Sequence, residues 1–238
     1  MAQIKFYDLE INPKGLIWSP NTCKTRFALN VKNIPYDTEW VGFHNLHGVV
    51  SSKTKSGVPP TVPIIEDFTH DGKVIQDSWE IAKYLEETYP DTPSLFHGSI
   101  GVHKAFEEYS AAKITSILFK MCVLQIHENC GSEEIKQWFR ENREAKLGTT
   151  LENFAGDAKT LYEPLKDNLR PVHTVLTQYP FVTGDKVGWA DVALASHFTL
   201  LSSLRPDIFE EAVLNAYDDA AIRDWWNRME KYRGEAPQ

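Results

Sequence analysis

The sequence predicts two domains of different class, an α/β domain followed by an all-helical domain. Strand-like and helix-like stretches alternate over residues 1–90, whereas only helical periodicities follow Ser99. A break rich in proline, Tyr89-Pro90-Asp91-Thr92-Pro93, separates the two regions. We therefore expect one domain over residues 1–90 and a second over residues 98–238.

Composition narrows the class of protein. The chain has 238 residues, of which 42% are hydrophobic and 24% charged, as in ordinary globular proteins. Its net charge of −8 argues against a nucleic-acid partner and favours solubility. No apolar run approaches the roughly 18 residues that cross a bilayer, and the N-terminus lacks the apolar stretch of a secretion signal. We expect a cytoplasmic protein with no membrane partner.

The first domain begins with a strand, a helix and a second strand. Alternation of Ile4, Phe6 and Leu9 predicts the first strand. Ser19 then occupies the N-cap of a helix and Pro20 its first position, where the missing N–H of proline is tolerated. The helix is expected to end at Asn33 to Pro35, and residues 36–41 form the second strand.

The rest of this domain is a loop, a hairpin and a helix. Residues 42–60 are poorly patterned and predict a loop with one short helix. Residues 61–66 and 73–76 predict the third and fourth strands, because Asp71-Gly72 between them is a hairpin-turn sequence. Asp77 is expected to cap the helix that follows.

In the second domain, helices are expected at about 100–128, 133–146, 151–176 and 190–203, with shorter ones to 232. Trp225 and Trp226 are expected to pack the last helix against the body. Phe106, Tyr109, Phe119 and Met121 recur at helical spacing and are candidates for a substrate pocket, although such a stripe more often belongs to a core.

Ser19 is the first candidate for chemistry. A hydroxyl at a helix N-terminus lies among unpaired N–H groups at the positive end of the helix dipole, where a thiolate is stabilised. Ser19 can therefore donate a hydrogen bond to the sulfur of a bound thiol, and Asn21 is placed to assist it. The plainer interpretation is that Ser19 only caps the helix.

Two further features suit an extended peptide ligand. Pro63 heads a strand, and a cis Val62–Pro63 bond would free the Val62 backbone to pair with a ligand, although a trans bond is commoner. Asp77 and Ser78 open a helix, where Asp77 suits an amine and Ser78 a carboxylate. Each residue is alternatively a simple cap.

Together these motifs resemble the glutathione-binding half of the cytosolic glutathione transferases. The resemblance is specific over residues 16–32 and 61–85, and it is greatest to the serine-type fungal-specific class A transferases, relatives of bacterial β-etherases. It implies a thioredoxin-like first domain with a mixed four-stranded sheet. It also implies that Ser19 activates the glutathione sulfur, that Val62 pairs with the cysteinyl backbone beside cis Pro63, and that Asp77 and Ser78 hold the γ-glutamyl end.

The implied activity is transfer of glutathione to a hydrophobic, aromatic electrophile, or glutathione-dependent reduction or ether cleavage. Glutathione is the co-substrate, no metal is implied, and a homodimer is expected from the family. In the second domain, Gly188 and Asp191 resemble the family's helix-capping box, except that glycine stands where a hydroxyl residue is expected.

Several residues are not assigned to the site. Cys23 is expected to be a buried helix residue, and Cys122 and Cys130 are expected to be free thiols. His44 and His47 lack further metal ligands and are expected in a solvated loop. Lys53 or Lys55 is a candidate for the glycyl carboxylate of glutathione, and the sequence does not choose between them.

Three alternatives to a transferase stay open. A thiol transferase or dehydroascorbate reductase needs cysteine at position 19, where this chain has serine. A non-catalytic ligandin for phenolic compounds would use the same binding residues. A domain tethered in a translation complex would carry further domains beyond Gln238.

Overall fold

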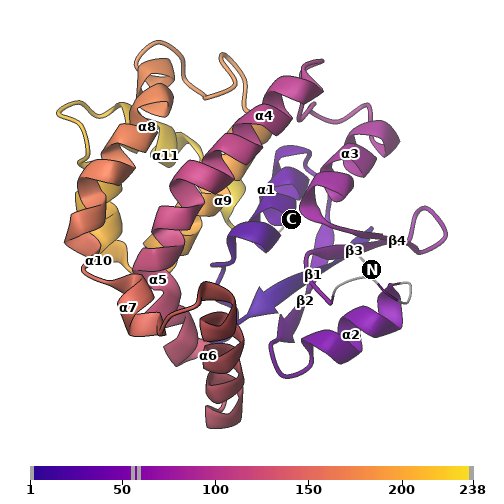
Figure 1. The fold of residues 1–238 in the computed structure, drawn as a ribbon. Coiled ribbons are helices and arrows are strands. Elements are labelled where there is room, and N and C mark those ends of the chain that lie inside the picture. The colour runs from indigo at the N-terminus through magenta and orange to yellow at the C-terminus, as the bar shows by residue number, and fades with distance from the viewer. Residues whose placement is uncertain (1–2, 55–56, 58–59, 236–238) are drawn as a thin grey trace.

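The structure is a computed structural model that describes residues 3–54, 57 and 60–235 (Figure 1). Its first part is built on a mixed four-stranded sheet of order β2-β1-β3-β4. The strands are β1 (Ile4–Glu10), β2 (Tyr36–Gly42), β3 (Ile64–Asp67) and β4 (Lys73–Gln76). β1 runs parallel to β2 and antiparallel to β3, which is antiparallel to β4.

Helices cover both faces of this sheet (Figure 1). On one face, α1 (Pro20–Val31) and α3 (Ser78–Thr88) bury Phe27 and Ile81 in the same core cluster as Phe6. On the other face, α2 (Leu46–Lys53) buries Val50 against Tyr7. Because successive β1 side chains point to opposite faces, Phe6 and Tyr7 join different clusters. The thioredoxin-like architecture expected from the sequence is confirmed.

In this part of the chain, the start of the third strand differs by several residues from the sequence prediction. It begins at Ile64 rather than at Thr61. Pro63 has no N–H to donate to the sheet ladder. The Thr61 carbonyl instead accepts a hydrogen bond of 2.7 Å from the Gln76 side chain. The Asp71-Gly72 turn is confirmed, since both residues have positive φ, 56° and 65°.

The second part is helical. Its elements are α4 (Ile100–Ser110), a π-helical turn (Ala111–Thr115), α5 (Ser116–Asn129), α6 (Glu133–Leu147), α7 (Leu151–Ala155), a 3-10 turn (Ala158–Leu161), α8 (Tyr162–Leu176), α9 (Trp189–Leu204), α10 (Pro206–Phe209), a second π-helical turn (Glu210–Leu214), α11 (Ala221–Arg228) and α12 (Glu230–Arg233). None of the helices in the described part of the chain is long and apolar enough to traverse a membrane.

The single helix expected over residues 151–176 is wrong, because the chain breaks at Gly156 and Asp157. Gly156 ends α7 with φ of 58°, a conformation that glycine adopts without strain. The Asp157 carboxylate then accepts from the Lys159 N–H at 3.0 Å and opens a new turn.

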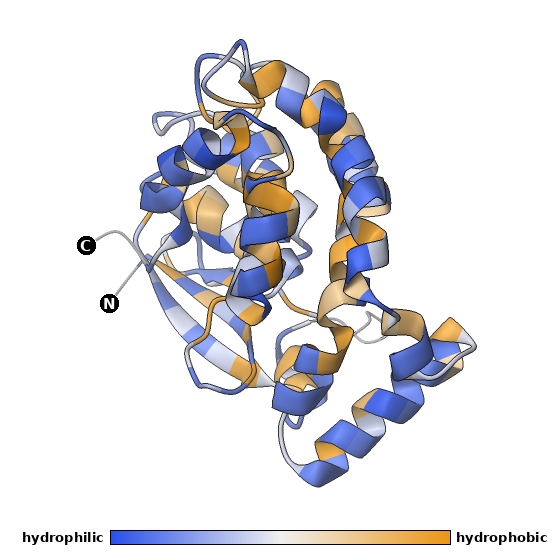
Figure 2. Ribbon diagram, turned by 90° about the vertical axis from the view of Figure 1, so that its left-hand side faces the viewer, coloured by the Kyte–Doolittle hydropathy of each residue, from blue (hydrophilic) through white to orange (hydrophobic). Residues whose placement is uncertain are grey.

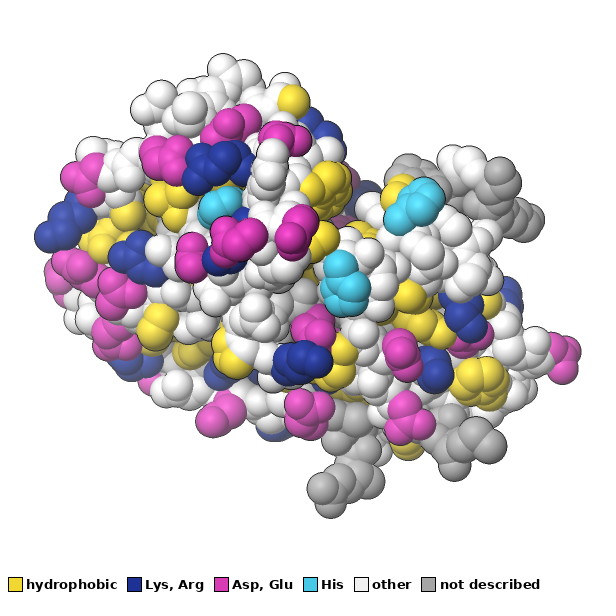
Figure 3. Space-filling view, turned by 90° about the horizontal axis from the view of Figure 1, so that it is seen from below, with side chains coloured by type: hydrophobic (Ala, Val, Ile, Leu, Met, Phe, Trp, Pro, Cys, Tyr) yellow, Lys and Arg dark blue, Asp and Glu magenta, His cyan; other side chains and the backbone are white. Residues whose placement is uncertain are grey.

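Helix α9 joins the two parts into one core. Its residues Trp189 and Phe198 are fully buried and belong to the same cluster as Phe27 of α1. In Figure 2 the helices carry hydrophobic and hydrophilic residues on different sides, as expected of helices that surround a shared core. Seen from below, basic and acidic side chains are interspersed over the surface, which is notched between two lobes (Figure 3).

The N-terminus of α9 explains why position 188 is glycine. A Cβ there would lie 2.8 Å from Thr183 Cγ2 and 2.9 Å from the Leu95 carbonyl oxygen, so no side chain fits. The Gly188 N–H donates to Asp191 Oδ2 at 3.1 Å, and the Thr183 hydroxyl donates to the same carboxylate. Trp225 Nε1 donates to the same carboxylate at 2.8 Å, which fastens α11 to the body as expected.

Candidate active site

Ser19 lies at the N-cap of α1, as the sequence predicts. Its side chain is 3% exposed, and its Oγ accepts from the Thr22 N–H at 3.5 Å, which is long for a hydrogen bond. Capping uses a lone pair of the oxygen and leaves the hydroxyl hydrogen unused. No acceptor for that hydrogen lies among the described residues. Ser19 can therefore cap the helix and donate to a ligand at the same time.

A buried ion pair fixes α1 on the sheet. The Arg26 guanidinium donates two hydrogen bonds to Asp8 Oδ2, of 2.9 and 3.1 Å, and another to Thr38 at 3.1 Å. Burial raises the pKa of Asp8 and Arg26 opposes that effect. Because Asp8 lies on β1 and Arg26 two turns into α1, the pair holds the start of α1 at the end of β1.

Ser19 opens onto a cavity of about 210 Å³. The first part of the chain supplies Leu9, Trp18, Ser19, Pro20, Asn21 and Phe43 to its wall. The helical part supplies Thr115, Phe119, Ile126, Phe139, Arg143 and Leu200. A cavity of roughly 150 Å³ is enough for benzene. This cavity between the two parts therefore has room for one substituted aromatic ring.

The Val62–Pro63 peptide bond is cis. The Gln76 side-chain amide binds the preceding residue, since it donates to the carbonyl and the hydroxyl of Thr61 at 2.7 and 3.1 Å. Among the described residues, none forms a hydrogen bond with the Val62 N–H or C=O. This backbone is therefore open to pairing with an extended ligand.

Asp77 caps α3 with one oxygen only. Its Oδ1 accepts from the Trp79 and Glu80 N–H groups at 2.9 and 3.2 Å. Within the described residues, no donor reaches its Oδ2, and the side chain is exposed. Ser78 is 5% exposed and begins the helix, so its N–H and hydroxyl both lie at the positive end of the α3 dipole. An amine and a carboxylate can be held side by side here.

The sheet brings these positions to one edge. Tyr7 pairs with Ile64 in the antiparallel β1–β3 ladder, so continuing that register sets Val62 beside Leu9, which lines the Ser19 cavity. The Asp77 N–H donates to the Pro63 carbonyl at 3.2 Å. Ser19, Val62 and Asp77 thus follow one another along the edge where β1 and β4 end and β3 begins.

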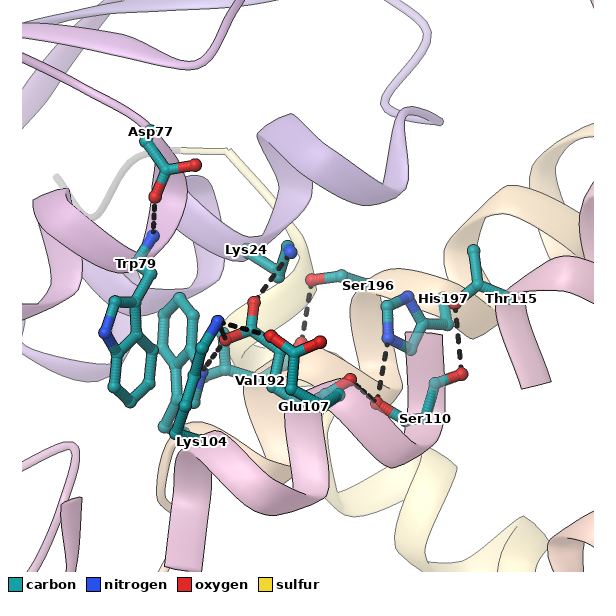
Figure 4. A network of polar contacts seen from close by, with 12 residues as sticks. Lys24, Asp77, Trp79, Lys104, Glu107, Ser110, Thr115, Val192, Ser196 and His197 are labelled. Carbon is teal, nitrogen blue, oxygen red and sulfur yellow. Dashed lines mark hydrogen bonds and ion pairs between the residues drawn. The ribbon is translucent and has the colours of Figure 1, made fainter. Parts of the chain in front are cut away.

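A polar network connects the two parts of the chain (Figure 4). Lys24 of α1 and Glu107 of α4 form an ion pair of 2.8 Å, with side chains only 11% and 7% exposed. Ser110 shares a hydrogen bond of 3.1 Å with His197 of α9. Burial lowers the pKa of His197 to about 3, with the Lys24 cation adding to the effect.

The network ends where the helix widens. The π-helical turn Ala111–Thr115 follows Ser110 directly, and Thr115 at its end lines the Ser19 cavity. Such turns are rare and frequently occur at functional sites. The long helix expected over 100–128 is thus continuous but changes pitch beside the cavity.

Other sequence candidates lie away from the cavity. Cys23 is fully buried, and burial raises the pKa of its thiol well above the ordinary value, so it is a poor nucleophile. His44 and His47 are exposed, and no group of three potential metal ligands occurs in the part of the chain that the structure describes. Lys53 pairs with Glu66 at 3.0 Å. Lys55 lies outside the described residues.

Of the four helical candidates for the pocket, only Phe119 lines it. Met121 is buried in the core, and Phe106 packs against this core. The Tyr109 hydroxyl donates to the Asn168 carbonyl at 2.7 Å. Sequence reasoning missed Arg143 and Phe139, which lie four residues apart on α6 and so share a face of that helix. That spacing was the only available signal.

Comparison with known proteins agrees with this geometry. The sequence model of the glutathione S-transferase N-terminal domain matches residues 18–88, and that of the C-terminal domain matches residues 101–232. A crystal structure of a glutathione transferase from Phanerochaete chrysosporium superimposes with a TM-score of 0.84 at 29% identity, covering 96% of each chain. A glutathione S-transferase of Ceriporiopsis subvermispora, solved in complex with glutathione, gives 0.83 at 30% identity, covering 96% of this chain and 97% of that one.

A curated relative points the same way. The glutathione S-transferase-like protein ustS of Aspergillus flavus is 26% identical over 228 residues, which cover 82% of this chain and 79% of the relative. The C-terminal match alone spans more than half of the 238 residues. The chain therefore belongs to the glutathione S-transferase family.

Proposed function

We propose that this transferase binds glutathione along the edge from Asp77 to Ser19 and transfers its sulfur to an aromatic electrophile in the adjoining cavity. In this proposal the Ser19 hydroxyl donates a hydrogen bond to the glutathione thiolate, and Asn21 lies beside it at the cavity wall. The observation that carries the proposal is a buried serine whose hydroxyl hydrogen is unused and which opens onto an aromatic-lined cavity.

The remaining residues would hold the tripeptide. The open Val62 backbone, beside cis Pro63, suits the cysteinyl unit of glutathione, since an extended peptide pairs with an unpaired strand edge. The free oxygen of Asp77 suits the γ-glutamyl amine, and the N–H and hydroxyl of Ser78 suit its carboxylate. The sulfur then bonds to the electrophilic carbon, and the leaving group departs with its electron pair.

The magnitude of the Ser19 contribution follows from its chemistry. A hydrogen bond donated to an anion is worth about 1.5–3 kcal/mol. Because each 1.4 kcal/mol is about a tenfold change, loss of the Ser19 hydroxyl should reduce the thiolate-to-thiol ratio of bound glutathione tenfold or more. Removal of a comparable hydrogen-bond donor in other enzymes lowers kcat by about 100- to 1000-fold.

The test compares Ser19→Ala with Ser19→Thr and Thr150→Ala. Thr150 caps α7 and is not on the cavity lining. Its Oγ1 accepts from the Asn153 N–H at 3.2 Å, so Thr150→Ala removes a helix cap without changing a residue of the site. We expect Ser19→Ala to lose about 10- to 1000-fold in kcat/KM while still binding glutathione. Ser19→Thr should keep part of the activity, and Thr150→Ala all of it.

Equal conjugation and peroxidase rates for wild type and Ser19→Ala would favour the alternative, a ligandin that carries phenolic compounds without turning them over. A labile glutathione adduct on Cys23 would instead indicate thiol transfer. The burial of Cys23 and the raised pKa of its thiol speak against that chemistry. Failure to retain glutathione at millimolar concentration would overturn the whole proposal.

We also propose that residues 1–90 bind glutathione and residues 98–238 receive the second substrate, and that the protein is a cytoplasmic homodimer. The domain assignment is supported by the two separate matches to the family and by the cavity between the two parts. Sedimentation velocity of the purified protein tests the dimer. A single species of monomer mass at micromolar concentration would contradict it.

A further inference from the structure

Arg143 of α6 is a cation at the cavity wall, and no acidic residue is among the described residues that line this cavity. Its Nε is shielded from solvent, and among the described residues it has no hydrogen-bond partner. Its guanidinium carbon lies 5.2 Å from the centre of the Phe139 ring, which also lines the cavity. The ring packs against the cation but supplies no negative charge to accept its hydrogen bonds.

The preceding turn of α6 shows how differently a paired arginine is placed. Arg140 donates to Glu144 at 2.9 Å and to Glu152 at 2.8 Å. In the part of the chain that the structure describes, no carboxylate forms an ion pair with Arg143, and burial lowers the pKa of its guanidinium. A partly desolvated cation without a partner among the described residues is stabilised when an anion binds beside it.

The rest of the cavity fits a ring that carries such an anion. Trp18, Phe43 and Phe119 give it apolar walls, and Ser19 and Arg143 are both on its lining. The planar fork of an arginine matches the two oxygens of a carboxylate. The overall charge of −8 does not oppose this, because charges separated by more than about 8 Å are screened at physiological salt.

We propose that the cavity selects aromatic electrophiles that carry a carboxylate, and that Arg143 binds this carboxylate while the ring lies against Phe139. This inference rests on the proposed function for the reacting atoms. In a chlorinated nitrobenzoate, for example, the glutathione sulfur bonds to the ring carbon and chloride leaves with the bonding electrons. The carboxylate stays on the ring unchanged.

The first experiment measures binding without turnover. Isothermal titration calorimetry gives Kd for 3,5-dinitrobenzoate and for its methyl ester, which carry no halide for the glutathione sulfur to displace, at saturating glutathione. Wild type should bind the acid at least about tenfold more tightly than the ester, a difference of about 1.4 kcal/mol. Arg143→Gln should remove this preference, and Arg143→Lys should keep part of it because the charge remains without the fork.

Lys146→Gln is the matched control. It removes the same charge from the same helix, but Lys146 is exposed and is not on the cavity lining. The preference for the acid should therefore survive in Lys146→Gln. Equal affinities for acid and ester in wild type would overturn the inference, and so would an equal loss of preference in Arg143→Gln and Lys146→Gln.

A second measurement separates this inference from the proposed function. The kcat/KM of wild type for chlorodinitrobenzoate and its methyl ester should show the same preference as binding, and Arg143→Gln should lose it while still conjugating the ester. If both compounds are conjugated equally well, the inference is wrong and the proposed function stands. If the acid is bound preferentially but neither compound reacts, the proposed function is wrong and the carboxylate site stands.

Discussion

Replacing Gly188 by alanine is expected to destabilise the protein, by steric contact in addition to the weak N-capping of alanine. The added methyl group would lie 2.8 Å from Thr183 Cγ2 and 2.9 Å from the Leu95 carbonyl oxygen. The Leu95 carbonyl cannot move freely, since it accepts the Trp189 N–H at 2.7 Å. The φ of Gly188 is −148°, so the backbone itself tolerates alanine.

The size of the effect follows from two opposing contributions. Overpacking by one methyl group typically costs about 1–3 kcal/mol. Glycine-to-alanine replacement restricts the unfolded chain, which offsets about 0.4–1 kcal/mol of that cost. Taken at the middle of both ranges, the net loss is about 1.3 kcal/mol. Because 1 kcal/mol corresponds to about 2–4 °C in a protein of this size, Tm should fall by about 3–5 °C.

Gly101→Ala is the matched control, measured by the same thermal unfolding. Gly101 lies in α4, and a Cβ built on it would meet nothing within 4 Å. It should raise Tm by about 1–4 °C, because only the unfolded-state effect remains. If Gly188→Ala unfolds at the wild-type temperature or above it, the steric explanation of the glycine is refuted.

Three other substitutions test the interface and the site. Glu107→Gln leaves the buried Lys24 ammonium without a carboxylate and should lower the free energy of unfolding in urea by about 3–5 kcal/mol; a loss below about 1 kcal/mol would contradict the importance of the pair. His197 stays neutral in the folded protein, since its pKa is lowered to about 3, so stability present above its ordinary pKa of about 6.5 is lost as the pH falls below it. Between about pH 7 and pH 5, wild type should lose about 2 kcal/mol more than His197→Gln, and equal losses would disprove the assignment. Asp77→Asn keeps the helix cap and removes the charge, so Tm should change little while calorimetry shows a Kd for glutathione about tenfold higher; an unchanged Kd would exclude Asp77 as the amine partner.

Local signals were sufficient for most of the fold. Ser19-Pro20, Asp71-Gly72 and Asp77 act on their own neighbours, and the structure shows each of them capping or turning where expected. The helix break that was missed is also local, since Gly156 and Asp157 end one helix and open the next turn. The break at Gly156 leaves the apolar periodicity of the two flanking segments intact, so a pattern of helical spacing runs across it without interruption.

The residues of the site differ in how clearly the local sequence marks them. Val62, Asp77 and Ser78 could be predicted from a few neighbouring residues. A proline at the head of a strand follows Val62, and Asp77 and Ser78 open a helix. The rest of the cavity wall could not be predicted, since Phe43 follows β2 whereas Phe139 and Arg143 lie on α6, far away in the sequence. Only helix packing decides which side chains of α6 meet the end of β1.

The structural and the proposed functional interpretations of the cap residues do not compete. Ser19 caps α1 with a lone pair, which leaves its hydrogen for a thiolate, and Asp77 caps α3 with Oδ1, which leaves Oδ2 for an amine. Capping also fixes each side chain before the ligand arrives, so less conformational freedom is lost on binding. Alanine at either position removes both roles together. Asp77→Asn separates the two roles of Asp77, because it keeps the cap and removes the charge that an amine would meet. Ser19→Thr keeps both the cap and the hydroxyl, so it is the control for Ser19→Ala.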